Sequence, residues 1–362
     1  GGLRKEEERC RKWPLLVGMK EGRDTPGGGG VAASGKDCLA PSHKDWEVVR
    51  CDVERAFGNA PVEGGRVKVK KRELQRMIHY VMDRHPQLHY YQGYHDIATV
   101  LLLTCGEASG VRILERLSLS FLSFYHSESL GPTKQLLDQI YVIVELVWED
   151  LHTFLRDRAG LDPYFALSWV LTWFAHDVPF ELQPRLFDAH LSSHPSLPVY
   201  LSAALVLANG EEALAMSPEM PELHTFFKSL PGRMALGDRV EDWLAHAYHL
   251  MKRVPPETLF NGDPPHSWAN YPYEWTVDRS GKLEAVVRSR TQTRRSRRMG
   301  RGEGHHWPLP AFAYSKQHAE RAEYARNADP PSSVVSTTVL IAFSVLGAAC
   351  FYAAISKEFL NV

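Results

Sequence analysis

Residues 85–96 read HPQLHYYQGYHD, and this stretch separates two helical patterns. In the preceding residues 72–84, apolar residues recur three and four positions apart, which places them on one helix face (Leu74, Met77, Ile78, Val81). Pro86 ends that helix at His85, because a residue before proline avoids the helical conformation. A second, apolar helix follows Gly93. We therefore expect residues 85–93 to form a loop between two helices.

The rest of the chain, to about residue 254, is also patterned for helices. Residues 1–18 are expected to form a short helix that ends in WPLLVG, and residues 133–157 form a long amphipathic pattern. Residues 164–174 are apolar nearly all round, which predicts a buried helix. No alternating apolar runs separated by hairpin turns are visible, so we predict an all-α domain over residues 1–256, closed by a pair of prolines.

Composition excludes several classes of function. With 44% hydrophobic and 23% charged residues the chain is ordinary for a globular protein, and its net charge of −1 argues against nucleic-acid binding. Its five cysteines form no CxxC pair, which is typical of a reducing compartment. The seventeen histidines show no HExxH spacing, so no metal site is expected. A Gly-rich insert at about residues 26–36 should loop out. It lacks the Lys-Ser/Thr of a phosphate-binding loop, so we expect neither a cofactor nor independent nucleotide hydrolysis.

Residues 257–331 differ in character from the predicted domain. They are rich in Gly, Pro and Arg, and residues 288–301 hold seven arginines and no acidic residue. Like charges at this density oppose compact folding. We interpret residues 257–331 as a mostly disordered basic linker, whose arginine cluster is either a solvated spacer or a contact for anionic lipid.

Residues 334–355 form an apolar run of 22 residues without a charge. As a helix they would span about 33 Å, close to the thickness of a bilayer's hydrocarbon core. The alternative is a buried core helix, which the preceding linker disfavours. Only seven residues follow the run, so insertion would be post-translational. We predict a single transmembrane tail anchor, with the preceding domain in the cytosol.

Three short motifs occur in order along the predicted domain. They are Arg9-x-x-x-Trp13, Val49-x-x-Asp52-x-x-Arg55 and Tyr90-x-Gln92, the last followed by Gly93. Together they resemble the RxxxW, IxxDxxR and YxQ motifs of the TBC domain of Rab GTPase-activating proteins. The similarity covers roughly residues 9–254, including LSWVLTWFAHDVPF (167–180) and RLFDAHLSSHPSLPVY (185–200). The departures are modest: Val49 stands for Ile, and His85 for the more usual Asn.

The resemblance implies a catalytic pair supplied to a GTPase in trans. Arg55 would be an arginine finger, and Gln92 would replace the GTPase's own water-positioning glutamine. GTP hydrolysis spreads negative charge over the transferred phosphoryl group, and an arginine supplied in trans accelerates it by about 10³–10⁵-fold. Lysine is a poor substitute, because only guanidinium offers a planar fork of donors. An amide suits the second role, since it both accepts and donates hydrogen bonds.

Each of these residues also has a simpler interpretation. Alone, Arg55 is typical of a solvated helix residue or of an i,i+3 partner of Asp52, and Gln92 of a loop amide. The motif context favours the catalytic interpretation for both. We expect Asp52 to orient Arg55, and Tyr90 to be a packing residue.

The first motif and a later pair have structural interpretations as well. Trp13 is expected to pack in the core. Arg9 is expected either to contact the GTPase or to fix the first helix, and the sequence does not separate these two roles. Arg185 and Asp188 are expected to form an internal i,i+3 salt bridge.

Three functions compete at this point. The first is a GTPase activator for a Rab GTPase, with GTP and Mg carried by the partner. The second is a catalytically silent TBC-like scaffold at a membrane, which the joint presence of Arg55 and Gln92 disfavours. The third, a receptor or transporter subunit, is disfavoured because one hydrophobic span is too few for a transport path. The resemblance, strongest to a tail-anchored member of the family, implies the endoplasmic reticulum membrane and a Rab of the ER-to-Golgi pathway.

Overall fold

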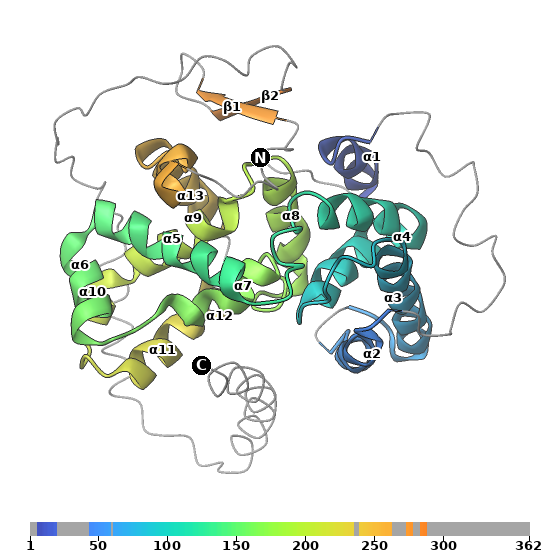
Figure 1. The fold of residues 1–362 in the computed structure, drawn as a ribbon, viewed down its shortest axis with the longest axis horizontal. Coiled ribbons are helices and arrows are strands. Elements are labelled where there is room, and N and C mark those ends of the chain that lie inside the picture. The colour runs from blue at the N-terminus through green and yellow to red at the C-terminus, as the bar shows by residue number, and fades with distance from the viewer. Residues whose placement is uncertain are drawn as a thin grey trace, which may run out of the picture. The chain divides into compact units, whose positions relative to one another are not determined.

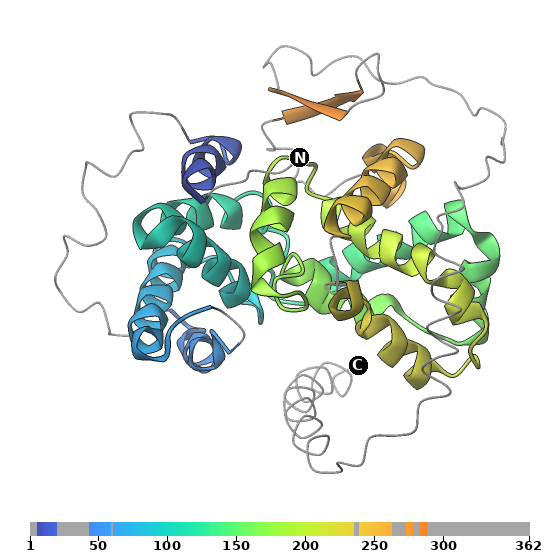
Figure 2. The same ribbon diagram turned by 180° about the vertical axis from the view of Figure 1, so that it is seen from behind.

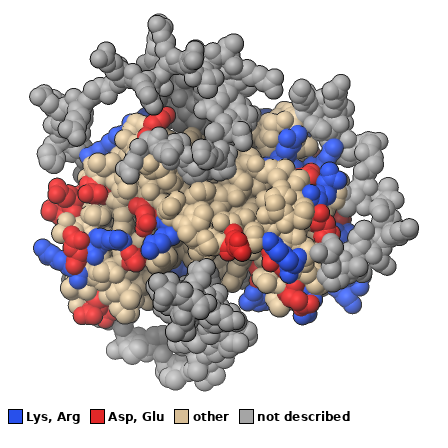
Figure 3. Space-filling model, in the orientation of Figure 1, with Lys and Arg blue, Asp and Glu red and all other residues tan. Residues whose placement is uncertain are grey.

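The computed structural model describes residues 6–19, 43–58, 61–234, 239–262, 273–277 and 283–287, all within the first of two units, residues 1–291 and 292–362. The Gly-rich insert at 26–36, the arginine cluster and the predicted span 334–355 lie outside the described residues. On the face in Figure 3, acidic and basic side chains stand beside one another rather than in separate patches.

The N-terminal part of the domain is a layer of four helices: α1 (Glu6–Leu16), α2 (Trp46–Arg55), α3 (Gly64–Arg84) and α4 (Tyr94–Ser118). The long helices α3 and α4 pack together, and α1 and α2 lie on opposite sides of them (Figures 1 and 2). The sequence predictions of the first helix and of the helix that ends before Pro86 are both confirmed.

Helix α4 is the one described helix that is long and apolar enough to cross a membrane, and 61% of its most apolar window is buried inside the domain. It is therefore the core helix of this layer. It bends at Gly106, whose φ of 73° lies in the left-handed region.

The C-terminal part is built around α9 (Leu197–Ala208), in which every residue from Leu197 to Leu207 is buried. Helix α9 packs against α5 (Gly131–Val147) and α13 (Val240–Arg253). A helix that is apolar all round must be covered on all sides, which explains its central position. The other helices of this part are α6 (Glu149–Thr153), α7 (Leu167–Leu171), α8 (Gln183–Leu191), α10 (Gly210–Leu214), α11 (Met220–Lys228) and α12 (Leu230–Met234). Short turns complete the set: one π-helical (Phe154–Arg158) and three 3-10 (Pro163–Ala166, Phe180–Leu182, Pro256–Gly262).

The long amphipathic pattern over residues 133–157 is helical in the structure, but it is divided into separate helices by a break at Trp148. This residue has φ −151° and ψ 83°, between α5 and α6. Its ring lies so close to Gly210 that a Cβ built there would be 2.5 Å from Trp148 Cζ3. The break lets the indole pack against the start of α10. Hydrophobic periodicity missed it, because both segments keep an apolar face.

The buried helix expected over residues 164–174 is only partly present. A 3-10 turn leads into α7, which ends at Leu171, and Trp173 and Phe174 then adopt positive φ values of 53° and 65°. Such a backbone is strained for large residues and persists only where packing fixes it. Phe174 meets Trp243 edge-on at 4.7 Å, so tertiary packing ends the helix.

Part of the expected linker has regular structure. Strand β1 (Tyr273–Val277) pairs antiparallel with β2 (Leu283–Val287), with Trp275 opposite Ala285. Aromatic and β-branched residues, which favour strands, are enriched in YEWTV and LEAVV. The all-α prediction is therefore confirmed for the described residues up to 262 and does not extend to this two-stranded sheet.

Candidate active site

Arg55 is the last residue of α2 and stands at its surface. The buried face of α2 consists of Val49, Asp52 and Val53, which follow helical spacing. Asp52 is 1% exposed and Arg55 is 57% exposed, and Arg55 Nη2 contacts Asp52 Oδ1. The carboxylate therefore holds one edge of the guanidinium, while much of the Arg55 side chain faces solvent.

Tyr90 connects the loop after α3 to α2. Its hydroxyl donates to Asp52 Oδ2 at 2.9 Å, and its backbone N–H donates to Asp45 Oδ2 at 2.8 Å. The imidazole Nε2 of His43 lies 3.1 Å from the carbonyl oxygen of Leu88. These contacts join the loop to both ends of α2. The motif tyrosine, expected only to pack, is thus also a hydrogen-bond donor to Asp52.

Gln92 and Gly93 form the turn into α4. Gln92 is exposed, and its amide makes no hydrogen bond to the residues that the structure describes. Gly93 has φ 100°, and a Cβ there would be 2.6 Å from Thr172 Cγ2. Both the conformation and the close approach of Thr172 require glycine at this position. Gly93 thereby lets Gln92 stand outward on a fixed turn.

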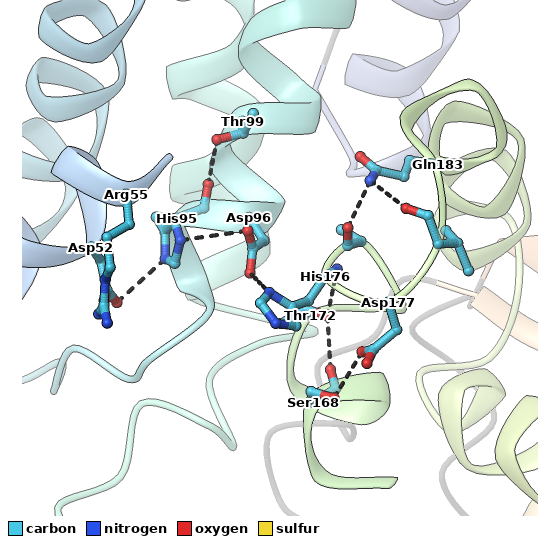
Figure 4. Close-up of polar contacts among 12 residues, drawn as sticks. Asp52, Arg55, His95, Asp96, Thr99, Ser168, Thr172, His176, Asp177 and Gln183 are labelled. Carbon is cyan, nitrogen blue, oxygen red and sulfur yellow. Dashed lines mark hydrogen bonds and ion pairs between the residues drawn. The ribbon is translucent and has the colours of Figure 1, made fainter. Parts of the chain in front are cut away.

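His95, which the sequence interpretation missed, lies beneath this turn between two carboxylates. Its Nδ1 is 3.3 Å from Asp52 Oδ2, and its Nε2 is 3.4 Å from Asp96 Oδ1. Asp96 Oδ2 in turn lies 3.2 Å from Nδ1 of His176 in the segment after α7 (Figure 4). The available signal was the His-Asp pair directly after the YxQGY stretch, at the start of a helix.

The proton affinities follow from these contacts. Burial opposes ionisation of Asp52, but hydrogen bonds from His95, Tyr90 and Arg55 outweigh it and hold the pKa of Asp52 below its ordinary value. Burial and the neighbouring Asp52 carboxylate raise the pKa of Tyr90 well above its ordinary value, so its hydroxyl remains a donor. Burial lowers the pKa of His95, but Asp96 and Asp52 outweigh it and the net shift is upward. The hydrogen bond to Asp96 likewise raises the pKa of His176.

Arg9 and Trp13 are not part of this cluster. Both donate to Asp188 of α8: Arg9 through Nε and Nη2 at 3.0 and 2.9 Å, and Trp13 through Nε1 at 2.9 Å. Trp13 is fully buried, as expected for a packing residue. Of the two roles left open for Arg9, the structure supports fixation of the first helix.

The i,i+3 salt bridge expected between Arg185 and Asp188 is replaced by longer-range pairs. Asp188 accepts from Arg9, while Arg185 pairs with Glu241 of α13, with Nη2 and Oε2 2.8 Å apart. Both partners come from distant sequence, so local spacing did not reveal them. In the described part of the chain, no group of three or more His, Cys, Asp or Glu side chains is placed to hold a metal ion.

This fold and motif arrangement define a class of protein. The sequence model of the Rab-GTPase-TBC domain matches residues 6–214, more than half of the chain. The chain belongs to this family. In fold it is similar to the crystal structure of the Ypt/Rab-GAP domain of Gyp1p, with a TM-score of 0.51 at 16% identity, covering 68% of this chain and 81% of that one.

Among curated proteins, the chain is similar to TBC1 domain family member 20. It is 34% identical to the mouse protein over 262 residues, which cover 72% of this chain and 62% of the relative, and 33% identical to the human protein. The GTPase-activating protein gyp10 of Schizosaccharomyces pombe is 31% identical over 56% of each chain. The chain thus spans about three fifths of the length of the family member 20 proteins that it matches.

Proposed function

We propose that this protein accelerates GTP hydrolysis by a Rab GTPase, with Arg55 and Gln92 supplied in trans. The observation that carries the proposal is the exposed guanidinium of Arg55 at the end of α2, held from below by the buried Asp52 carboxylate. The loop that carries the exposed Gln92 is bonded to the same carboxylate through Tyr90. Membership in the Rab-GTPase-TBC domain family supports a Rab as the partner.

The chemistry is electrostatic and requires no cofactor on this chain. In the docked complex, the Arg55 guanidinium lies against the phosphoryl oxygens whose charge develops in the transition state. The Gln92 amide orients the attacking water, accepting from it while donating toward the phosphate. GTP and Mg²⁺ are carried by the GTPase. This chain contributes position and charge, and it hydrolyses no nucleotide by itself.

Substitution of the finger tests the proposal on the full chain in detergent, against a panel of GTP-loaded Rabs. With a responsive Rab, Arg55→Ala is expected to lose about 10³-fold or more of the acceleration. Arg55→Lys should be nearly as poor, because it lacks the planar fork. The matched control is Arg50→Ala, an exposed arginine earlier on α2 that pairs with Glu47 and should retain activity. Equal acceleration by wild type and Arg55→Ala would refute the assignment, and binding without any acceleration would favour the silent scaffold.

We further propose that residues 334–355 tether the protein to the endoplasmic reticulum membrane as a single-pass anchor, with the catalytic domain in the cytosol. The support is the uncharged 22-residue run and its moderate hydrophobicity, which suits a thinner bilayer. This location favours a Rab of the ER-to-Golgi pathway as the substrate and a role in vesicle-mediated transport.

A further inference from the structure

The His95 side chain lies between two carboxylates, and a neutral imidazole cannot donate a hydrogen bond to both of them. Its two ring nitrogens face two different carboxylates, Asp52 Oδ2 at 3.3 Å and Asp96 Oδ1 at 3.4 Å. A neutral imidazole carries one N–H, so one nitrogen would present a lone pair to a carboxylate. The imidazolium carries two N–H groups and so presents a positively charged N–H to each carboxylate. The side chain is 11% exposed, so water screens these interactions little.

The buried Asp52 carboxylate has several partners but few positive charges. Arg55 contacts Oδ1, while the Tyr90 hydroxyl and His95 share Oδ2. Tyr90 contributes a hydrogen bond and no charge. Within the described part of the chain, Arg55 and the ionisable His95 are the two basic side chains in direct contact with this 1% exposed carboxylate.

The proposed function requires Arg55 to leave Asp52 and contact phosphate. Removing one member of a buried ion pair is strongly unfavourable when the remaining charge has no compensation. A second cation on the same carboxylate lessens this cost. Resting on the proposed activity, we propose that His95, as an imidazolium, is a positioning residue that keeps Asp52 neutralised and so releases Arg55 to the GTPase.

The titratable and charged groups around His95 belong to several elements, and together they set the pH at which His95 loses its proton. Asp52 of α2 and Asp96 of α4 favour its charged form, and the Tyr90 hydroxyl lies 3.4 Å from Nδ1. From the segment after α7, His176 shares Asp96 and opposes the charge on His95. Beyond it, Asp177 pairs with Lys228 of α11 at 2.8 Å. Arg55, which shares the Asp52 carboxylate with His95, also opposes the positive charge on His95.

The sign of the effect follows from these contacts. Burial lowers the pKa of His95, but the two carboxylates raise it above the ordinary histidine value on balance. His95 is therefore charged at a pH below its raised pKa, and it loses its proton as the pH rises through that pKa. When His95 is neutral, Asp52 has no second positive charge, and its ion pair with Arg55 is harder to break. We therefore expect the activator-dependent kcat to fall as the pH rises through this range, which gives the pH profile an alkaline limb. KM should change little, because Arg55 acts in the transition state.

The experiment measures activator-dependent kcat and KM from pH 6 to 9 with the full chain in detergent and a responsive Rab, using Arg55→Ala as the background. His95→Gln keeps a polar side chain without charge. It should lower kcat about tenfold near pH 7, the equivalent of one pKa unit of charge interaction, and abolish the alkaline limb. His249→Gln, an exposed histidine on α13, is the matched control and should retain the wild-type profile.

A second, milder variant keeps the test decisive if His95→Gln fails to fold. His176 is 61% exposed, and His176→Gln should move the alkaline limb to higher pH because Asp96 then interacts with His95 alone. A purely structural role for His95 predicts no such movement. An unchanged limb in either variant, or a shift to lower pH in His176→Gln, would overturn the inference while leaving the GTPase-activating function intact.

A measurement without any GTPase separates the two proposals. NMR titration of the His95 imidazole in the full chain should show that Arg55→Ala raises the pH at which His95 deprotonates, because Asp52 then has one cation fewer. Arg50→Ala should leave this titration unchanged. If no Rab responds to the wild-type chain, the proposed function fails, and the titration still reports the coupling of His95 to Arg55. If Rabs respond but the titration is unaffected by Arg55→Ala, the inference about His95 fails.

Discussion

At the scale of single residues, the site depends on how one buried carboxylate is shared. Asp52 alone would be costly to bury, and its three partners, Arg55 of α2, Tyr90 of the loop after α3 and His95 of α4, hold its pKa low despite burial. This sharing gives the exposed Arg55 a fixed starting position. Gln92 is exposed for a different reason. It precedes Gly93, whose positive φ and close approach to Thr172 exclude a larger residue from the turn. The two proposed fingers thus stand on rigid supports.

Gln92→Ala tests the second finger. We expect it to lower kcat of the activated reaction while KM stays similar, because the amide acts on the attacking water in the transition state. A Rab whose own catalytic glutamine is replaced should still respond to the wild-type chain and not to Gln92→Ala. Gln87→Ala, another exposed glutamine of the same loop, is the control. A Rab variant insensitive to the wild-type chain would contradict the two-finger mechanism.

At the scale of elements, α1 is fastened to α8 by one carboxylate. Arg9 and Trp13 lie one helical turn apart and converge on Asp188, 175 or more residues away in sequence. Arg9 and Asp188 are 12% and 6% exposed, so the pair is well shielded from solvent. By contrast, the pair between Arg185 and Glu241 is exposed at the glutamate, 58%.

This contrast predicts different costs for two similar ion pairs. Arg9→Ala removes a guanidinium that donates two hydrogen bonds to the buried Asp188 carboxylate, and should lower the free energy of unfolding by about 3–5 kcal/mol. Arg185→Ala breaks a more solvent-exposed pair and should cost about 1 kcal/mol or less. Urea unfolding of both variants measures the difference. Because α1 lies across α3 and α4 from α2, folded Arg9→Ala should keep its specific activity (Figures 1 and 2). A fall in kcat without loss of stability would instead place Arg9 in contact with the GTPase.

At the scale of the whole molecule, buried neutral histidines should make the domain sensitive to acid. Burial lowers the pKa of His126 to about 4 and that of His190 to about 3. Their folded pKa lies below the unfolded value, so their stabilising contribution is present above about pH 6.5 and is lost as the pH falls. Each of these histidines lowers the free energy of unfolding by about 1.4 kcal/mol for each pH unit between about 6.5 and its folded pKa.

His190→Phe should therefore reduce the slope of unfolding free energy against pH by about 1.4 kcal/mol per unit between pH 6.5 and 4. The imidazole of His190 stacks on Trp173, with ring centroids 4.8 Å apart, and neither ring nitrogen has a hydrogen-bond partner among the described residues, so a phenyl ring fits the environment. Urea midpoints across this pH range provide the measurement, with His249→Gln as control. Parallel pH profiles for wild type and His190→Phe would show that His190 is not the titrating group.

The membrane anchor is a prediction about the chain as a whole. Residues 326–362 fused to a fluorescent protein should give reticular, carbonate-resistant fluorescence, because an uncharged helix of this length spans a bilayer. The control replaces Leu340 and Leu346 by arginine, which is costly at the centre of a membrane helix and should release the fusion. A diffuse signal from the unmodified fusion would assign residues 334–355 to a soluble part of the protein.

The sequence by itself determined the helical class and the helix before Pro86, because periodicity and proline act locally. It also identified Arg55 and Gln92 as candidate fingers through their motifs. Tertiary structure alone placed Arg9 and Trp13 on Asp188, broke the helix at Trp148 and set His95 between Asp52 and Asp96. Periodicity shows which face of a helix is apolar but not which distant group meets a polar side chain on it. That choice depends on how helices far apart in sequence pack, and here it decides which carboxylate each cation contacts.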